Sequence, residues 1–505
     1  MNLLGTKGIP SLITWGAYFS FFFVQLFLAA VMPGMVMYGV PIEGGKRLIY
    51  LCNGYLCYYF SIWGCFLIHF TGIFPITHFA DNYGEYLVAS MIIANVTSVF
   101  WYYYGIMVHP DQSRTNIGIY DFFMGTVLYP RIGIVDIKMV AECRWSWLTL
   151  FILTLSCAVK QYETIGYVSR EMGVMVIAHW LYSNATVKGE HYIPCTWDMF
   201  HERFGWMLNF WNITGVPFLY CFQSFYILKN QENITKNSPI WFISIVYILL
   251  IVGYYIFDTA NSQKASWKMP GLERNTFPQL PWAELSDPVR VIRTTKGDLV
   301  VDGWYAFGRK MQYTGDIMMA TAWGCACGFG SLLPYFYLLF FISMITHRQW
   351  RDEIRCKQKY GALWDAYVRT VPNVFIPGWS FVHWVLTGEM PPISSEVSLV
   401  LRSSKYIKKN INKNEIEELE SKKIEKIEIE KAEKIESNGN EDEEEENESD
   451  DIRYKIENGI KQENGNGITK KRGYQRKEKN GIHESNGNNG NGINSNSNHI
   501  KVKIV

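Results

Sequence analysis

Apolar runs long enough to cross a bilayer fill most of the first 400 residues, with short polar stretches between them. A helix rises about 1.5 Å per residue, so roughly 20 apolar residues span the hydrocarbon core. The spans that the pattern predicts are residues 12–38, 49–72, 86–107, 147–168, 172–187, 204–228, 240–257, 316–329 with 332–346, and 371–386. The chain is therefore predicted to be an all-α polytopic membrane protein with about ten transmembrane helices.

Two polar loops separate the predicted spans, at residues 109–144 and 258–310. The second loop and the segment after His347 are rich in Lys and Arg, so the positive-inside tendency places both in the cytosol. The apolar region between them contains the glycine-interrupted string CGFGSLLP, which predicts a broken helix.

The character of the chain changes at about Ser403. Runs such as EIEELESKKIEKIEIEKAEKIE, EDEEEENESDD and NGNNGNGINSNSN are low in complexity and poor in large apolar side chains, which predicts disorder. We therefore divide the chain into a membrane domain, residues 1–400, and a low-complexity charged tail, residues 401–505. The ending KVKIV has the spacing of a K-x-K-x-x retrieval signal, and chance in a Lys-rich tail explains it equally well.

The composition agrees with a membrane protein that carries a soluble tail. Of 505 residues, 48% are hydrophobic and 16% aromatic, and 48 Lys and Arg almost balance 47 Asp and Glu. A net charge near zero argues against nucleic acid as a partner. None of the ten cysteines forms a CxxC pair, so we expect neither disulfides nor a bound metal.

A cationic helical face is predicted directly after the apolar run PYFYLLFFISMIT. On a helix, Arg348, Asp352, Arg355 and Lys359 fall within roughly 60° of one another. This face is either a site for a polyanionic ligand or an ordinary basic flank of a membrane span.

A second group of basic residues comes from the loop at residues 258–310. Lys264 and Lys268 are four residues apart on one potential helix face, and Arg309 and Lys310 end the loop. A nucleotide with a pyrophosphate and a 2′-phosphate needs such charge-assisted contacts, together with aromatic side chains for its rings.

The segment HWLYSNATVKGEH also carries several polar groups beside a predicted span, among them Tyr182, Asn184, Lys188 and Glu190. Ionisable groups at membrane depth are costly, which makes them candidates for function. The alternative is an interfacial helix end.

The strings GWYAFGRKMQYTGD, residues 303–316, and HRQWRDEIRCKQKYGALWDAYVRTVPNVFIPG, residues 347–378, resemble the C-terminal signature of the membrane sterol reductases. That family includes the delta-14, delta-7 and delta-24(28) sterol reductases and the lamin B receptor. The resemblance runs from about Gly34 to Gly378.

Five stretches are similar to the fungal delta-24(28) branch, namely IYDFFMGTVLYPRIGIVDIKM, KQYETIGYVS, AHWLYSNATVKGE, PCTWDMFHERFGWML and FWNITGVPF. Other branches usually have Gly-Asp at the place of Trp211 and Asn212, and Trp at the place of Gly215. These departures favour the delta-24(28) branch over the delta-14 and delta-7 branches.

The resemblance implies NADPH-dependent reduction of the 24(28) double bond of a sterol in the endoplasmic reticulum membrane, as a late step of ergosterol-type biosynthesis. It places the cofactor in the C-terminal half, about residues 204–386. The cofactor-contacting positions it implies are Lys264, Lys268, Trp304, Arg309, Arg348, Asp352, Tyr360 and Tyr367. Relatives often have Arg at the place of Lys268, and Tyr182 matches a Tyr near the sterol.

An isolated alkene is not electrophilic, so an acid must protonate one carbon before hydride attacks the other. Asp352 and Tyr182 are the candidate residues for proton delivery. The neighbouring Arg348 and Arg355 would hold Asp352 ionised, which makes it a poor acid unless it acts through Tyr182. An aromatic, water-excluding site would stabilise the cation.

Other classes of protein remain alternatives. The string KYGALWDAYVRTVPNVFIPG also resembles membrane isoprenylcysteine methyltransferases, which bind S-adenosylmethionine. A non-catalytic sterol-binding scaffold is a third class. The partners we expect are a sterol, the lipid bilayer and other enzymes of sterol biosynthesis, and the exact sterol and the oligomeric state stay open.

Overall fold

The fold was obtained as a computed structural model, which describes residues 9–108, 115, 117–268, 290–375, 385–388 and 398–399. The predicted tail, residues 401–505, lies outside the described residues, as does the middle of the last predicted span.

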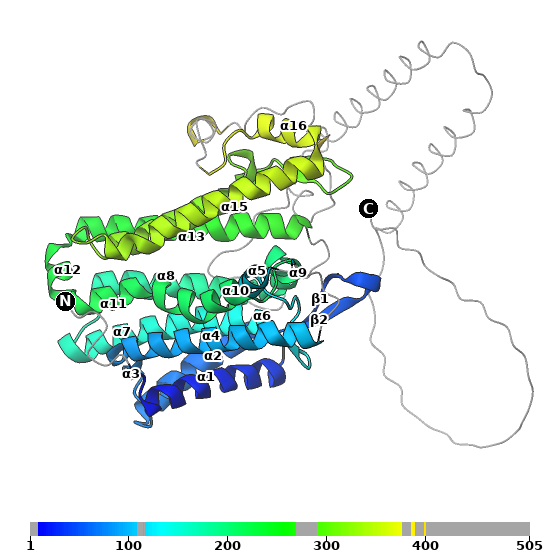
Figure 1. Cartoon of the computed structure of the whole chain (residues 1–505). Helices are drawn as coiled ribbons and strands as arrows, with labels where there is room; N and C mark the ends of the chain where they lie inside the picture. The colour runs from blue at the N-terminus through cyan, green and yellow to red at the C-terminus, as the bar shows by residue number, and fades with distance from the viewer. Residues whose placement is uncertain are drawn as a thin grey trace, which may run out of the picture. The chain divides into compact units, whose positions relative to one another are not determined.

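Helices dominate the described residues and run roughly side by side (Figure 1). The α-helices are α1 Leu12–Val31, α2 Gly54–Phe70, α3 His78–Asp81, α4 Tyr83–Val108, α5 Gly118–Met124, α6 Ile137–Val140, α7 Thr149–Ile165, α8 Arg170–Lys188, α9 Trp197–Phe200, α10 Trp206–Phe210, α11 Phe222–Lys229, α12 Gln231–Asn237, α13 Ile240–Lys268, α14 Met311–Ala326, α15 Phe336–Tyr360 and α16 Ala362–Thr370. In Figure 1 the blue N-terminal helices lie on one side of the bundle, and α13 and α15 lie on the other.

Short elements complete the fold. The strands are β1 Met35–Pro41, β2 Arg47–Cys52, β3 Arg131–Ile132, β4 Val135–Asp136, β5 Arg290–Ile292, β6 Leu299–Val300 and β7 Ser398–Leu399. Two π-helical segments, Ala141–Leu148 and Trp211–Tyr220, continue α6 into α7 and α10 into α11. The second contains Pro217, whose missing N–H and bulky ring disfavour an ordinary α-helical turn.

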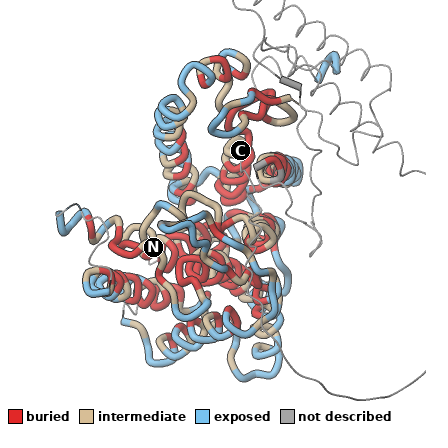
Figure 2. The backbone as a smooth tube through the Cα atoms, turned by 90° about the vertical axis from the view of Figure 1, so that its right-hand side faces the viewer, coloured by how far each residue is buried: buried red, intermediate tan, exposed pale blue. Residues whose placement is uncertain are grey.

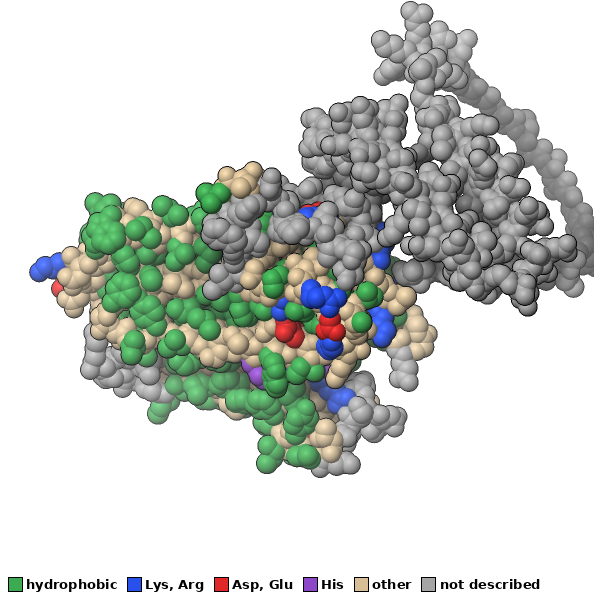
Figure 3. Space-filling view, turned by 90° about the horizontal axis from the view of Figure 1, so that it is seen from above, with side chains coloured by type: hydrophobic (Ala, Val, Ile, Leu, Met, Phe, Trp, Pro, Cys, Tyr) green, Lys and Arg blue, Asp and Glu red, His purple; other side chains and the backbone are tan. Residues whose placement is uncertain are grey.

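Three helices of the described ranges are long and apolar enough to cross a membrane: α1, α4 and the Ile240–Ala265 part of α13. The prediction of about ten spans is thus not confirmed by length and hydropathy, because the other predicted spans, as far as the structure describes them, are shorter, interrupted or more polar. Buried residues gather along the inward faces of the helices (Figure 2). Apolar side chains cover much of the face drawn in Figure 3. Others are exposed on α1, such as Phe23, which is 67% exposed, as lipid contact requires.

The predicted end of the first span, at residue 38, is wrong. The fold also contains strands and is not purely helical. Helix α1 begins after the N-cap Ser11 and ends at Val31, where Pro33 and Gly34 follow and disfavour further helix. Strand β1 then pairs with β2 in antiparallel register, from Met35 opposite Cys52 to Pro41 opposite Arg47. A β-hairpin therefore occupies the residues between the first two helices.

Helices α13 and α14 approach each other so closely at Gly315 that no side chain fits there. A Cβ added to Gly315 would lie 2.5 Å from the carbonyl oxygen of Gly253, so only glycine fits there. Helix α13 also continues beyond its predicted end at residue 257 as far as Lys268. The prediction that Lys264 and Lys268 lie on a helix is confirmed.

Helix α15 carries the predicted cationic face and ends where the sequence indicates. Its C-terminal residue Tyr360 is followed by Gly361, whose φ of 59° is favoured only for glycine. Helix α16 then begins in a new direction and buries Tyr367.

Candidate functional site

The polar end of α15 meets the beginning of α14 through a group of paired charges. The Lys310 ammonium, on the residue before α14, donates to Asp352. Arg355 lies one turn further along α15 and donates to the same carboxylate at 2.7 Å. Asp352 is therefore the shared counterion of two cations and links the two helices.

The environment of Asp352 favours its ionised form. Burial by itself disfavours the charge, but Lys310 and Arg355 outweigh it and hold the pKa of this carboxyl below its ordinary value. Asp352 is thus a carboxylate at neutral pH and has no proton to transfer to a substrate.

Arg309 is buried beside this group, and both of its terminal nitrogens donate to the protein. Its Nη1 donates to the carbonyl oxygens of Val371 and Pro372 at 2.7 and 2.8 Å. Its Nη2 donates to Glu353 at 2.5 Å. Arg309 therefore joins the start of α14 to α15 and to the segment after α16, and these contacts give it a structural role beside any ligand.

The C-terminal end of α13 supplies the next predicted residues. Lys264 places its ammonium 5.6 Å from the ring centroid of Tyr305, and Trp304 donates its indole N–H to the Thr259 hydroxyl at 2.8 Å. Both contacts bring the turn Gly303–Ala306 against α13. The side chain of Lys268 lies outside the described residues.

Tyr360 and Tyr367 stand on either side of the break at Gly361 and share a ring neighbour. The Trp364 ring lies 6.3 Å from the Tyr360 ring and 5.1 Å from the Tyr367 ring, between centroids. Burial raises the pKa of the Tyr367 phenol. The two residues thus form an apolar wall next to the charges of α15.

Arg348 faces a different partner. Its Nη2 lies 3.5 Å from a carboxylate oxygen of Asp198 in α9. Asp352 is one turn further along the same helix, so Arg348 belongs to the same polar end of α15 while contacting the N-terminal half of the chain.

Tyr182 lies in another part of the site. Its hydroxyl donates to Asp316 of α14 at 3.0 Å. Its ring is 4.7 Å from Trp147, 5.4 Å from Phe257 and 5.8 Å from Trp323, between centroids. The phenol and its carboxyl partner are therefore enclosed by aromatic rings.

The two predicted proton-delivery residues do not share a partner, because Tyr182 contacts Asp316 and Asp352 contacts Lys310. Asp316 follows Lys310 by six residues, a rise of about 9 Å along α14. Asp316 was not selected from the sequence, although it ends the string GWYAFGRKMQYTGD. Its signal was a carboxyl group in an apolar segment, which is a candidate for function by itself.

The remaining polar residues of HWLYSNATVKGEH are used inside the fold. Lys188 pairs with Asp258 at 2.6 Å. Glu190 pairs with the buried Arg144 at 3.2 Å and accepts from the Gly54 N–H at 2.6 Å. These contacts hold the C-terminal end of α8 to neighbouring helices.

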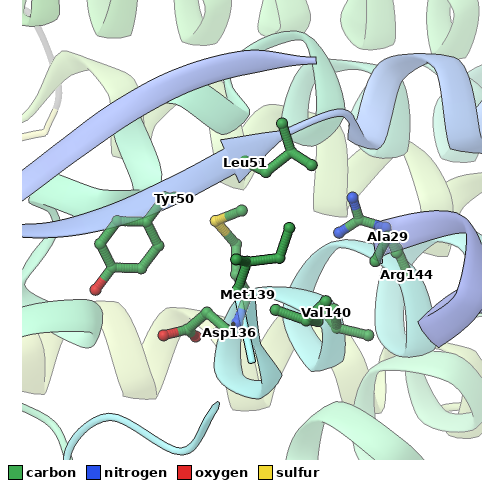
Figure 4. A pocket seen from close by; sticks show the side chains of 9 residues that line it. Ala29, Tyr50, Leu51, Asp136, Met139, Val140 and Arg144 are labelled. Atoms are coloured by element: carbon green, nitrogen blue, oxygen red, sulfur yellow. Dashed lines mark hydrogen bonds between the residues drawn. The ribbon is translucent and has the colours of Figure 1, made fainter. Parts of the chain in front are cut away.

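A small cavity lies apart from this site, beside the β-hairpin (Figure 4). It is lined by Ala29, Tyr50, Leu51, Ile134, Val135, Asp136, Met139, Val140 and Arg144. Tyr50 and Asp136 lie on one side of the view and Arg144 on the other. None of the predicted site residues lines this cavity.

The donor set at the polar end of α15 fits a polyanionic group. Lys264, Lys310, Arg348 and Arg355 surround Asp352 from three elements, and charged guanidinium and ammonium groups are the residues that bind phosphates. An aromatic side chain adjoins them at Tyr305, whose ring centroid lies 5.6 Å from the Lys264 ammonium, and Trp304 precedes it in the same turn. The charge of these residues therefore suits a phosphorylated nucleotide.

Fold and site together define a helical membrane protein with a cationic group at one end of its last long helix and a phenol–carboxyl pair among aromatic rings. A profile of the "Ergosterol biosynthesis ERG4/ERG24 family" matches residues 1–379. The chain belongs to this family, as its sequence resemblance predicts.

Individual relatives include sterol reductases of two kinds. The chain is 40% identical over 384 residues to a Delta(24(24(1)))-sterol reductase of Gibberella zeae, covering 74% of this chain and 64% of that relative. It is 36% identical over 384 residues to the Delta(24(24(1)))-sterol reductase erg4A of Aspergillus fumigatus, covering 75% of this chain and 81% of the relative. It is 35% identical over 372 residues to a Delta(14)-sterol reductase of Dictyostelium discoideum, covering 72% and 77%.

Proposed function

We propose that the chain reduces the 24(28) methylene double bond of a sterol side chain, with NADPH as the reductant, in the endoplasmic reticulum membrane. The names of the Gibberella and Aspergillus relatives support the position of the bond. The Tyr182–Asp316 pair inside an aromatic cluster is the observation that carries the chemistry. Reduction at position 14 is the second candidate, because a Delta(14)-sterol reductase is also among the similar proteins.

The cofactor proposal rests on the cations at the polar end of α15. Lys264, Lys310, Arg348 and Arg355 would hold the phosphate groups, and Trp304 and Tyr360 stay the predicted ring-binding side chains. Bound there, a reduced nicotinamide supplies a hydride. Lys268, the last residue of α13, stays a predicted contact of the cofactor.

Tyr182 is the better candidate of the two predicted acids. Asp352 is held as a carboxylate by two neighbouring cations, so its role is to position Lys310 and Arg355. The Tyr182 phenol carries a proton at neutral pH and is oriented by Asp316. We assign Tyr182 as the proton donor and Asp316 as the residue that positions it.

The aromatic rings around Tyr182 would stabilise the positive charge of the reaction intermediate. Protonation of the methylene carbon breaks the π bond and leaves a tertiary cation on the branch carbon. The faces of Trp147, Phe257 and Trp323 lie within 4.7–5.8 Å of the Tyr182 ring centroid and would attract that cation. Trp323 is buried, whereas Tyr182, Trp147 and Phe257 are half-buried against the core, so a bound sterol would complete the exclusion of water, which would otherwise add to the cation. The hydride then forms the second C–H bond.

The test uses membranes from cells that express the full chain. They are incubated with NADPH and sterols unsaturated at 24(28), 14 or 7, and the products are measured by mass spectrometry. The expected product gains two hydrogens only with the 24(28) sterol. With deuterated cofactor the label is on the branch carbon, and with D₂O it is on the former methylene carbon. Reduction confined to position 14 or 7 would refute the proposed position of the bond.

A thermal-shift measurement on the purified chain separates the reductase from the methyltransferase class. NADPH is expected to raise the unfolding temperature, since a ligand that binds only the folded state stabilises it. Stabilisation by S-adenosylmethionine instead would contradict the proposal. Stabilisation by a sterol without any turnover would favour the scaffold alternative.

A further inference from the structure

The short helix α9, from the N-terminal half of the chain, contacts two cations of α15. Asp198 lies 3.5 Å from the Arg348 Nη2. The neighbouring Trp197 carries the Arg355 guanidinium 4.3 Å from its ring centroid. Arg348 and Arg355 are seven residues apart, which is two turns and therefore one face of the helix. A single turn of chain thus engages two cations of the cationic face, two helical turns apart.

The Asp198–Arg348 pair differs from the other ion pairs of this group. Arg309 and Lys310, which precede α14, pair with the α15 carboxylates Glu353 and Asp352. Asp198 instead comes from an element 150 residues earlier in the chain. The distance of 3.5 Å exceeds the roughly 2.7–2.9 Å of a well-formed charge-assisted hydrogen bond.

Both side chains of this pair are accessible to a ligand. The Arg348 and Asp198 side chains are 47% and 35% exposed, against 11% and 22% for Lys310 and Asp352. A partly solvated pair contributes little free energy. Because the contact is long and exposed, an anion with more charge and more acceptors can replace Asp198 on Arg348.

Asp198 is nevertheless held in place by its neighbours. The Trp197 indole donates to Glu202 at 2.9 Å. The buried Lys138 ammonium donates to the carbonyl oxygens of Met199 and Glu202 at 3.0 and 2.6 Å. After displacement, the carboxylate therefore stays near Arg348 and continues to repel an incoming anion.

We infer that Asp198 is an internal competitor for the anion-binding position at Arg348, and that it sets how much negative charge a nucleotide needs to bind. The inference rests on the proposed binding of NADPH at the polar end of α15. A phosphate group offers three acceptor oxygens and close to two negative charges, which suits it to displace one carboxylate. A ligand without a phosphate at this position leaves the Asp198–Arg348 pair intact.

The test measures the NADPH dissociation constant of the full chain in nanodiscs by isothermal titration calorimetry, at several salt concentrations. Asp198→Asn removes the competing charge and is expected to tighten NADPH binding about two- to fivefold at low salt, since an exposed ion pair contributes that much. Its affinity should also fall more steeply with salt. Asp198→Glu keeps the charge and is expected to bind as the wild type does.

Asp365→Asn is the matched control, because it removes a carboxylate that pairs with the exposed Lys357 on the neighbouring helix. Tighter binding by Asp198→Asn alone supports the inference. An unchanged or weaker affinity would overturn it, since a purely structural Asp198 can only lose affinity when it is replaced. A wild-type chain that does not bind NADPH would refute the proposed cofactor and this inference together.

Discussion

Replacing Tyr182 with Phe tests the proposed chemistry with the smallest change that the site permits. The substitution removes one hydroxyl, whose partner is Asp316 at 3.0 Å. The ring and its contact with Phe257, 5.4 Å between centroids and nearly parallel, are retained. Packing is therefore preserved, and the change is confined to the proton donor and its hydrogen bond.

The expected loss follows from the role of the phenol. A positioned general acid contributes about 10²- to 10⁴-fold to the rate, which corresponds to roughly 3–5 kcal/mol of activation free energy. The loss of one hydrogen bond, with a buried carboxyl left unpaired, lowers the free energy of unfolding by about 1–3 kcal/mol. The effect on turnover thus exceeds the effect on stability, and NADPH binding should not change.

The assay is single-turnover reduction of the sterol by purified protein with saturating NADPH, combined with thermal unfolding and NADPH titration of the same sample. Tyr220→Phe is the matched control. That phenol accepts a hydrogen bond from Trp211 at 3.0 Å in the same aromatic cluster, and its ring lies 6.0 Å from Trp147. The control loses one buried hydroxyl but no proposed acid.

Three results would refute this reasoning. Turnover by Tyr182→Phe within a few-fold of the wild type would exclude the phenol as the donor. An equal loss in Tyr220→Phe would show that any buried hydroxyl of the cluster matters, and that the donor lies elsewhere. A rate loss together with weakened NADPH binding would place Tyr182 in the cofactor site instead.

The remaining predictions concern stability, measured by thermal unfolding in detergent. Arg309→Met leaves two carbonyls and one carboxylate unpaired and should lower the free energy of unfolding by about 2–4 kcal/mol. Arg293→Met, which removes an exposed ion pair, should change it by less than about 1 kcal/mol. Gly361→Ala should lower the free energy of unfolding by about 1–3 kcal/mol, because the φ of Gly361 is 59°. Gly330 has open space around it, so an equal loss in Gly330→Ala would contradict the backbone argument. Since the pKa of Asp352 is lowered in the folded state, its ionisation stabilises the protein above the ordinary carboxyl pKa, and the advantage of the wild type over Asp352→Asn should shrink as the pH falls below about 4. A constant difference down to pH 3 would contradict this assignment.

The parts of the site that the sequence predicted depend on neighbours along one helix. Arg348, Asp352 and Arg355 follow one another at helical spacing, so their common face could be inferred from periodicity alone. The break at Gly361 could also be inferred, because glycine is the residue that ends helices with a positive φ. Such features need only the order of the residues in one segment.

The parts that the sequence did not predict depend on contacts between distant segments. Tyr182 and Asp316 are 134 residues apart, and Asp198 and Arg348 are 150 residues apart, so neither pair leaves a local pattern. The β-hairpin was missed for another reason. Its strands, Met35–Pro41 and Arg47–Cys52, are apolar and adjoin apolar helices, and short apolar runs do not distinguish strand from helix.

Helix α14 connects the two halves of the proposed chemistry at a set distance. Lys310 at its start binds the Asp352 carboxylate, and Asp316 binds the Tyr182 phenol about 9 Å further along. Proton and hydride must reach adjacent carbons of one double bond. In the proposed function, Lys310 and the neighbouring cations would hold the phosphate groups and the aromatic cluster would hold the double bond, so a reductant bound at the start of α14 would have to reach about 9 Å along the helix. This requirement favours a dinucleotide, whose phosphates and reactive ring are far apart, over a compact reductant.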